Sequence, residues 1–360
     1  MLLIKNFYSK IKHHASSLAF IAGFIWDNIM LSRIDHSFAN IMLTTYLSLA
    51  AIIILILNVH EAKRSLGREA ARYAPWLPLI LQFCFGSLFS AYIIFYIRSA
   101  SLVVGWPFIV FLIFLVISNE LFHKRYLSPA FQLPIFFIVL FSYTIFSLPI
   151  LLGRMGSDVF IMSGLLSLVL IFILARISKR LAPEAFLKGR FLLWVSIISI
   201  YVLFNIAYFS NIIPPVPLSL KEIGVYHSVA RQSGDFFSVS FEPGLFYPLI
   251  KDTANTFNRS GNEPVYVFSS IFAPTRLTVP IYYDWSYFDE AKKIWITTDH
   301  LQFSITGGRD QGYRGYYKKS GIFPALWRVD VETSRNEIIG RIEFKVVNGQ
   351  TPTNLVTETR

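Results

Sequence analysis

Residues 212–220, IIPPVPLSL, separate two parts of the chain that differ in character. Each proline removes a backbone N–H donor and its ring clashes with the preceding helical turn, so no helix continues through this stretch. Before it, long apolar runs recur with short polar gaps between them. After it, short segments rich in Tyr, Phe, Val and Ile are divided by Gly, Asn, Asp and Pro, which is typical of β-strands. We therefore place a domain boundary between residues 213 and 214.

The part before the boundary has the composition of a membrane domain. The whole chain is 54% hydrophobic and 15% charged, with a mean hydropathy of +0.51, which is too apolar for an ordinary soluble domain. A helix needs about 20 apolar residues to cross the hydrocarbon of a bilayer, and 17 is near the lower limit. Seven runs approach or exceed this length: 15–31, 40–59, 75–97, 102–118, 131–152, 157–175 and 191–213. They predict an α-helical polytopic membrane domain over residues 1–213.

The positive charges of this domain predict its orientation, because cytoplasmic loops are enriched in lysine and arginine. Only Arg33, Arg98 and Arg154 fall in the gaps on one side of the predicted membrane. The gaps on the other side carry Lys5, Lys10, Lys12, Lys63, Arg64, Arg68, Arg72, Lys124, Arg125, Arg176, Lys179, Arg180, Lys188 and Arg190. We expect the N-terminus to be cytoplasmic. With seven crossings, everything after residue 213 is then extracytoplasmic.

The net charge of +11 indicates a membrane topology and not a nucleic-acid partner. Residues 1–213 hold 17 Lys+Arg against 7 Asp+Glu, whereas residues 214–360 hold 16 against 15. The C-terminal part therefore has no basic excess with which to bind a phosphate backbone. The single cysteine, Cys84, excludes a disulfide or a cysteine-based zinc site within one chain. The expected partners are the lipid bilayer and an envelope glycan or membrane protein.

The segments after the boundary predict an all-β antiparallel sandwich of Ig-like type over residues 214–347. The clearest pattern is RVDVET, in which Val329 and Val331 alternate with charged residues, and RIEFKV repeats it. The turn SRNE joins these two segments as a hairpin. The last residues, 348–360, show no apolar period and are expected to form a disordered tail.

Several of these segments resemble a known family. WSYFD, a glycine-rich basic loop, WRVDVET and IIGRIEF, in that order, resemble the module called domain of unknown function 2914, most specifically over residues 272–347. GFIWDNIMLSRID and IFAPTRL are similar to segments of longer relatives. The resemblance implies a β-rich extracytoplasmic module on a bacterial inner-membrane protein. The chain departs from the family pattern at Tyr283, where His is common, and at Ala325 and Leu326, which precede Trp327 where Gly is common.

The basic loop, residues 303–321, reads FSITGGRDQGYRGYYKKSG. Its glycines do not have the spacing of a phosphate-binding P-loop, and a strand is expected to follow instead of a helix. One interpretation is a glycine-bent connection with solvated cations. The other is an edge that stacks on sugar rings and pairs with anions, as arginine and aromatic side chains do. The candidate ligand-binding residues are Arg309, Tyr313, Arg314, Tyr316, Lys318 and Lys319, with Trp285 and Trp327.

Other residues that could carry chemistry have simpler interpretations. Tryptophan in an alternating strand more often belongs to a core than to a ligand platform. Asp284, Asp289 and Glu290 cluster around a bend, where solvated acids are common, although a glycosidase would need such a carboxyl pair. His227 and His300 have no ligand spacing around them. We therefore expect no metal, no cofactor and no enzymatic activity.

One alternative keeps a catalytic role open. The segment LSRIDHS places Arg33, Asp35 and His36 in the first outward loop. Polytopic transferases that use lipid-linked sugars tend to hold a catalytic acid in such a loop. The sequence thus predicts a membrane protein whose outward sandwich binds or scaffolds an envelope component, with a lipid-linked-sugar transferase or a transporter as the alternative.

Overall fold

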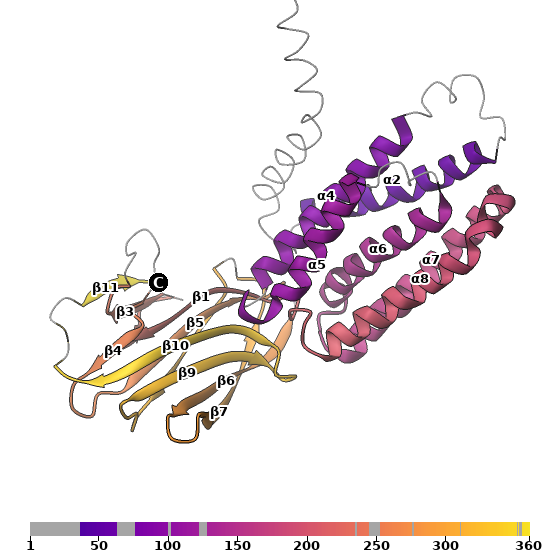
Figure 1. Cartoon of the computed structure of the whole chain (residues 1–360). Helices are drawn as coiled ribbons and strands as arrows, with labels where there is room; N and C mark the ends of the chain where they lie inside the picture. The colour runs from indigo at the N-terminus through magenta and orange to yellow at the C-terminus, as the bar shows by residue number, and fades with distance from the viewer. Residues whose placement is uncertain are drawn as a thin grey trace, which may run out of the picture. The chain divides into compact units, whose positions relative to one another are not determined.

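The computed structural model describes residues 37–62, 76–99, 102–121, 128–234, 236–244, 253–275, 277–309, 311–350, 352 and 355–360. These residues form a helical unit and a β unit, and the chain passes from the first to the second between Ile213 and Pro214 (Figure 1). The predicted order, apolar helices followed by antiparallel-rich sheets, is confirmed.

The described part of the helical unit contains six helices. They are α2 (Ser37–Glu61), α4 (Leu77–Ser99), α5 (Leu102–Leu121), α6 (Pro129–Leu152), α7 (Ser157–Leu181) and α8 (Pro183–Phe209). All except α5 are long and apolar enough to cross a membrane, and α5 contributes a shorter apolar stretch, Trp106–Leu115. The predicted helix over residues 15–31 lies outside the described residues.

The ends of the helices follow from local sequence. Helices α6 and α8 begin with Pro129 and Pro183, because proline at the first turn costs no backbone hydrogen bond. Helix α6 ends at Leu152, and Gly153, which follows it, has a φ of 66° in the left-handed region. The basic residues between the last two predicted spans lie mostly within α7 and α8 and not in a loop, because lysine and arginine are good helix formers. Hydropathy therefore located the apolar part of these helices and missed their polar ends.

Helices α6 and α7 are joined by buried hydroxyl groups as well as by apolar contacts. The Thr144 and Ser167 hydroxyls lie 2.7 Å apart, and the Ser163 hydroxyl donates to the Thr144 carbonyl at 3.1 Å. Gly164 lies against the rings of Phe141 and Tyr201, which leave no room for a larger side chain. Small and hydroxyl-bearing residues are what allow helices to approach closely in a bilayer.

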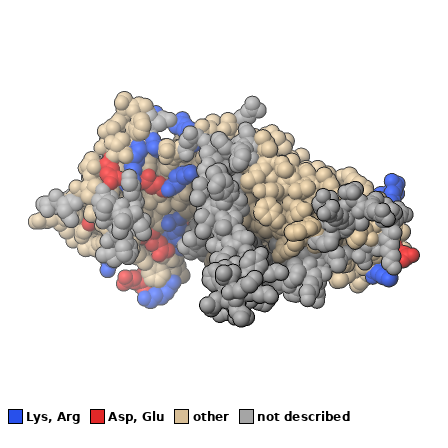
Figure 2. Space-filling view, turned by 90° about the horizontal axis from the view of Figure 1, so that it is seen from above, with Lys and Arg blue, Asp and Glu red and all other residues tan. Residues whose placement is uncertain are grey.

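On the face that Figure 2 shows, visible charged side chains gather over the strands and at one end of the helices.

The described residues of the β unit form three sheets. The first has the strand order β1-β5-β8, the second β4-β10-β9-β6-β7 and the third β11-β3-β2. The first comprises β1 (Ser219–Tyr226), β5 (Val265–Phe272) and β8 (Tyr313–Lys319). The second comprises β4 (Thr256–Arg259), β6 (Thr278–Asp289), β7 (Ile294–Thr306), β9 (Ala325–Thr333) and β10 (Ile338–Asn348). The third comprises β2 (Ser228–Arg231), β3 (Phe237–Phe241) and β11 (Val356–Thr359).

The first and second sheets face each other (Figure 1), and aromatic side chains lie between them. Trp285 of β6 meets Tyr317 of β8 edge to face, with ring centroids 6.0 Å apart, and Trp327 of β9 packs beside Trp285. The Tyr283 hydroxyl of β6 lies 2.7 Å from the Ser269 hydroxyl of β5. Among the described strands every pairing is antiparallel except that of β4 with β10. The sheets do not close into a barrel.

The end of the chain corrects one expectation. Residues 348–360 were expected to be disordered, but Val356–Thr359 forms strand β11 on the edge of β3. Phe237 and Arg360 exchange both backbone hydrogen bonds, at 3.0 and 2.8 Å, and the Arg360 guanidinium lies 3.0 Å from the Glu222 carboxylate. A segment without alternating apolar residues can still join a sheet, because a sheet edge offers backbone donors and acceptors to any extended segment.

Candidate ligand groove and an acidic sheet face

A groove of about 340 Å³ lies beside strand β8 in the β unit. Among the described strands β8 lies at a sheet edge, since β5 is the only one of them that pairs with it. Three of the predicted ligand-binding residues, Tyr313, Arg314 and Tyr316, line this groove. The other lining residues are Arg231, Phe237, Tyr283, Leu301, Gln302, Phe303, Gly315 and Tyr317. The groove thus combines arginine with aromatic rings, as the sequence predicts for this loop and strand.

The glycines before β8 shape a tight loop. A side chain at Gly307 would overlap the carbonyl oxygen of Pro274, and Gly308 and Gly312 have φ of 92° and 83°. The Gly308 N–H donates to the Ala273 carbonyl at 3.1 Å. Glycine is therefore needed here because two backbone segments approach closely and because the chain adopts positive φ, and not because the loop binds phosphate. This geometry matches the interpretation of the loop as a glycine-bent connection.

All four of the loop's cations lie over aromatic rings. The guanidinium carbon of Arg309 is 4.8 Å from the ring centroid of Tyr313, and that of Arg314 is 5.6 Å from Phe236. The Lys318 ammonium is 5.9 Å from the ring of Tyr266. These contacts fix long side chains against a rigid sheet edge and lower the entropy that a ligand contact would cost. Tyr316, with 42% of its surface exposed, remains open to a partner.

The other three predicted ligand-binding residues lie inside the sandwich. Trp285 and Trp327 are 0% and 1% exposed, so neither can serve as a ligand platform. The Lys319 ammonium lies 5.6 and 5.2 Å from their rings and forms an ion pair with Asp299. Burial alone would raise the pKa of Asp299, but the hydrogen bonds from Lys319 and Thr298 lower it below its ordinary value. The alternation of apolar and polar residues along their strands had already indicated that the two tryptophans are buried.

Tyr283 joins the groove to the core. Its hydroxyl donates to the Gly315 carbonyl of β8 at 3.2 Å and contacts Ser269, while its ring stacks on Phe303 at 5.0 Å. Burial raises the pKa of this phenol, so the hydroxyl stays protonated and able to donate. Tyr283 stands where the resembled family commonly has His.

The opposite face of the second sheet carries an acidic cluster that the sequence did not predict. His300 of β7, Asp284 of β6, Asp330 of β9 and Arg341 of β10 are successive neighbours across the sheet. The His300 Nδ1 atom is 3.5 Å from Asp284 and 3.9 Å from Glu332. Arg341 donates two hydrogen bonds to Asp330, at 2.6 and 2.9 Å. Carboxyl groups from two strands, those of Asp284 and Glu332, thus both lie within 4 Å of His300.

Crowding of these acids changes their titration. Burial raises the pKa of Glu332 to about 7, and the charges of Asp284 and Asp330 add to the effect. Burial also raises the pKa of Asp284. In contrast, the hydrogen bonds between Arg341 and Asp330 stabilise the charged form of the arginine and raise the pKa of Arg341. A carboxyl group that titrates near neutral pH is a feature of functional sites as well as of structural clusters.

The remaining candidate residues have structural roles in the described part of the chain. Asp289 accepts from the backbone N–H groups of Ala291 and Lys292 at 2.9 and 3.0 Å and so closes the β6–β7 turn, as expected for an acid at a bend. His227 is not isolated. Its two ring nitrogens lie 2.8 Å from Glu263 and 3.1 Å from Glu242. Within the described residues, no group of three His, Cys, Asp or Glu side chains could hold a metal ion.

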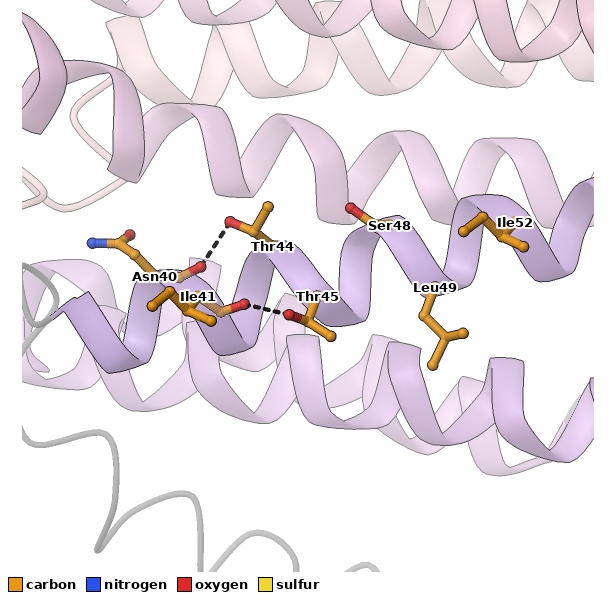
Figure 3. A pocket seen from close by; sticks show the side chains of 7 residues that line it. All are labelled: Asn40, Ile41, Thr44, Thr45, Ser48, Leu49 and Ile52. Atoms are coloured by element: carbon orange, nitrogen blue, oxygen red, sulfur yellow. Dashed lines mark hydrogen bonds between the residues drawn. The ribbon is translucent and has the colours of Figure 1, made fainter.

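A second concave surface lies on helix α2 of the helical unit, with a volume of about 560 Å³ (Figure 3). Two of its hydroxyl groups are bonded within the helix: Thr44 and Thr45 each donate at 2.7 Å to the carbonyl four residues earlier. Thr44 also contacts the Tyr143 hydroxyl of α6 at 2.8 Å. This surface offers no charged group to a ligand. The alternative site of Arg33, Asp35 and His36 lies outside the described residues.

Comparisons with known proteins support a family match for the C-terminal region only. Residues 279–346 match the model of a family described as "Protein of unknown function (DUF2914)", which confirms the resemblance inferred from the sequence. No curated protein matches the chain. A solved structure of Pseudomonas fluorescens alkylpurine DNA glycosylase AlkC bound to DNA containing an abasic site analog is 8% identical, covering 87% of this chain and 99% of that chain, with a TM-score of 0.21. A similarity this low carries no argument about fold or function.

Proposed function

We propose that this chain is a membrane-anchored binding protein whose β unit binds an anionic, sugar-containing polymer in the groove beside β8. The observation that carries the proposal is the groove itself, in which Arg231 and Arg314 lie among tyrosine and phenylalanine rings. Sugar rings stack on aromatic faces, and guanidinium groups pair with carboxylate or phosphate in a planar, two-pronged geometry. The open edge of β8 suits a polymer, because an extended ligand can pass along it.

The proposed affinity comes from several weak contacts. An exposed cation–π contact contributes about 0.5–1 kcal/mol, and an exposed ion pair contributes about 0.2–1 kcal/mol. A single sugar would therefore bind weakly, whereas a polymer that repeats the same contacts gains from effective concentration. The proposal requires no covalent bond to form or break, so we propose binding without catalysis.

The location we propose is a bacterial inner membrane with the β unit on the extracytoplasmic side. The distribution of lysine and arginine between alternate loops supports this orientation. At the turn between α6 and α7, the charge of Arg154 is offset by Asp158, whose carboxylate lies 2.7 Å away. At the other end of α7, Arg176, Lys179 and Arg180 are clustered. A phosphatase fused after Arg360, so that strand β11 is kept, should be active. An active cytosolic reporter at that position instead would contradict the orientation.

The binding proposal is tested on the full chain in lipid nanodiscs. The double variant Arg314→Ala with Tyr316→Ala should weaken binding to anionic envelope polysaccharides at least tenfold relative to the parent chain. The control Lys292→Ala with Lys345→Ala also removes exposed side chains, from the β6–β7 turn and from β10. If both double variants bind as the parent does, or if the parent binds no such polymer, the proposed function is wrong.

A further inference from the structure

Helix α2 has two faces with different surroundings. One face, which includes Leu43, Leu47 and Ala50, is buried within the helical unit. The other is open, since Ile41 is 65% and Ile52 is 54% exposed. Its side chains recur every three or four positions and so share one side of the helix. We call this side the α2 face; it forms the concave surface of Figure 3 and comprises Ile41, Thr44, Thr45, Ser48, Leu49 and Ile52.

The α2 face differs in composition from the exposed side of helix α8. Among the exposed α8 residues from Phe191 to Phe209, only Ser199 bears a hydroxyl, and the others are Phe, Leu, Ile or Val. Half of the α2 face consists of threonine and serine. In a bilayer, large apolar side chains suit the lipid tails, whereas contacts between helices are enriched in small and hydroxyl-bearing residues. The α2 face therefore has the composition of a helix contact.

The shape and the hydrogen bonding of the α2 face also suit a helix better than a polar ligand. Thr44 and Thr45 already donate to carbonyl groups of their own helix, and the face carries no charged side chain. Its concave surface of about 560 Å³ leaves room for a ridge of side chains from a neighbouring helix. The partner of this face is therefore expected to be an apolar helix.

We propose that the apolar run 15–31 forms a helix that packs antiparallel on the α2 face. The run lies outside the described residues, and only residues 32–36 separate it from Ser37, where α2 begins. Helices joined by so short a connection are antiparallel neighbours. At about 1.5 Å per residue, the run is about 26 Å long, which exceeds the distance of about 17 Å from Ile41 to Ile52.

The sequence of the run complements the α2 face. Ala15, Ala19 and Gly23 recur every four positions, so they lie on one side of the predicted helix. Counting back from the connection, Gly23 lies level with Thr45, and Ala19 lies level with Leu49. Small residues thus oppose branched ones, which lets the two backbones approach closely.

The charges before the run support the same arrangement. A helix that crosses the membrane beside α2 places Lys5, Lys10 and Lys12 on the side that holds most of the lysine and arginine of this domain. A run that did not cross would leave these three lysines on the opposite side. The distribution of charge therefore favours this segment as the partner of the α2 face, in preference to a second copy of the chain.

The test is cysteine cross-linking in membrane vesicles that contain the full chain. The substitution Cys84→Ala removes the natural thiol, so that only introduced thiols react. Copper phenanthroline should oxidise Gly23→Cys with Thr45→Cys to a disulfide, because that bond needs Cα atoms within about 7 Å of each other. The control Phe24→Cys with Thr45→Cys moves one thiol by about 100° around the predicted helix. It should give at most a fifth of the yield.

Tryptic peptides identify the bond. Trypsin cleaves after Lys12, Arg33 and Lys63, so a bond within one chain joins peptides 13–33 and 34–63 in the monomer band of a gel. A bond between two chains appears in the dimer band instead. A second pair, Ala19→Cys with Leu49→Cys, should link as the first pair does. This pair keeps the test decisive if one substitution disturbs the contact.

Two outcomes would overturn the proposal. In the first, neither pair gives more intramolecular product than the Phe24→Cys control, which would mean that lipid covers the α2 face. In the second, Thr45→Cys alone links two chains in a dimer band, which would mean that a second copy occupies it. Because no residue of the β unit is altered, either outcome leaves the polymer-binding proposal standing.

Discussion

Replacing Glu332 by glutamine should stabilise the β unit above pH 7. The folded chain holds the pKa of this carboxyl at about 7, against an ordinary value of 4.5. That difference corresponds to roughly 3 kcal/mol of unfavourable free energy for the ionised group in the folded state. Water reaches part of this sheet face and screens the charge, so we expect Glu332→Gln to raise the free energy of unfolding by about 1–2 kcal/mol at pH 8.

The sign and the pH window follow from the direction of the shift. Because the folded-state pKa lies above the unfolded value, the folded chain binds this proton more tightly than the unfolded chain. The cost of ionisation is therefore absent below about pH 4.5, grows as the pH rises from 4.5 to 7, and is complete above 7. The difference between parent and variant should follow the same course.

Thermal unfolding of the full chain in detergent, followed by near-UV circular dichroism, measures this difference. For a unit of about 150 residues, 1–2 kcal/mol corresponds to roughly 3–8 °C in the melting temperature at pH 8, falling to about zero near pH 4.5. The matched control is Glu343→Gln, an exposed acid on β10, whose effect should be small at both pH values. An equal gain at both pH values, or a loss at pH 8, would refute the argument that burial raises the pKa of Glu332.

Two further substitutions and one deletion test the β unit by the same measurement. His227→Leu should lower the free energy of unfolding by about 3 kcal/mol or more, because it leaves the two glutamates that contact its ring without that donor; a loss below 1 kcal/mol would contradict this. Gly307→Ala should lower the melting temperature by several degrees because its Cβ would overlap a backbone carbonyl. Gly349→Ala should not, because its Cβ would lie 4.0 Å from the Asn258 Oδ1 atom, an ordinary van der Waals contact. Deleting residues 356–360 should also destabilise the unit, since β3 loses its partner strand; an unchanged melting temperature would show that β11 contributes nothing.

The order of elements was predictable because it depends on patterns that are local in sequence. Run length and the prolines after Ile213 indicate helices before the boundary and strands after it, and Val329 and Val331 do alternate into the core. Helix ends were less predictable. Hydropathy measures which residues suit hydrocarbon, but Lys179 and Arg180 remain helical at the polar end of α7 because backbone hydrogen bonds and not apolarity define a helix.

The candidate site was predictable only in part because it depends on which strands are neighbours. Arg314 and Tyr316 were identified by the composition of one loop and strand, and they do line the groove. Asp284 and Glu332 are 48 positions apart in sequence and meet only because β6 pairs with β9. The alternation of each strand predicts that these side chains share a face. It does not predict the pairing that puts them side by side.

Register decides the chemistry of both faces of the second sheet. A slip of one residue in β6 would turn Asp284 into the core and Tyr283 out of it. The Tyr283 hydroxyl opposes such a slip, because it bonds β5 and β8 of the facing sheet at 2.7 and 3.2 Å. Phenylalanine at this position would keep the ring and lose both bonds, so it should loosen β8 and weaken polymer binding. Tyr283 therefore holds the edge strand in place, a role that needs the reach of a phenol rather than the acid–base properties of a histidine.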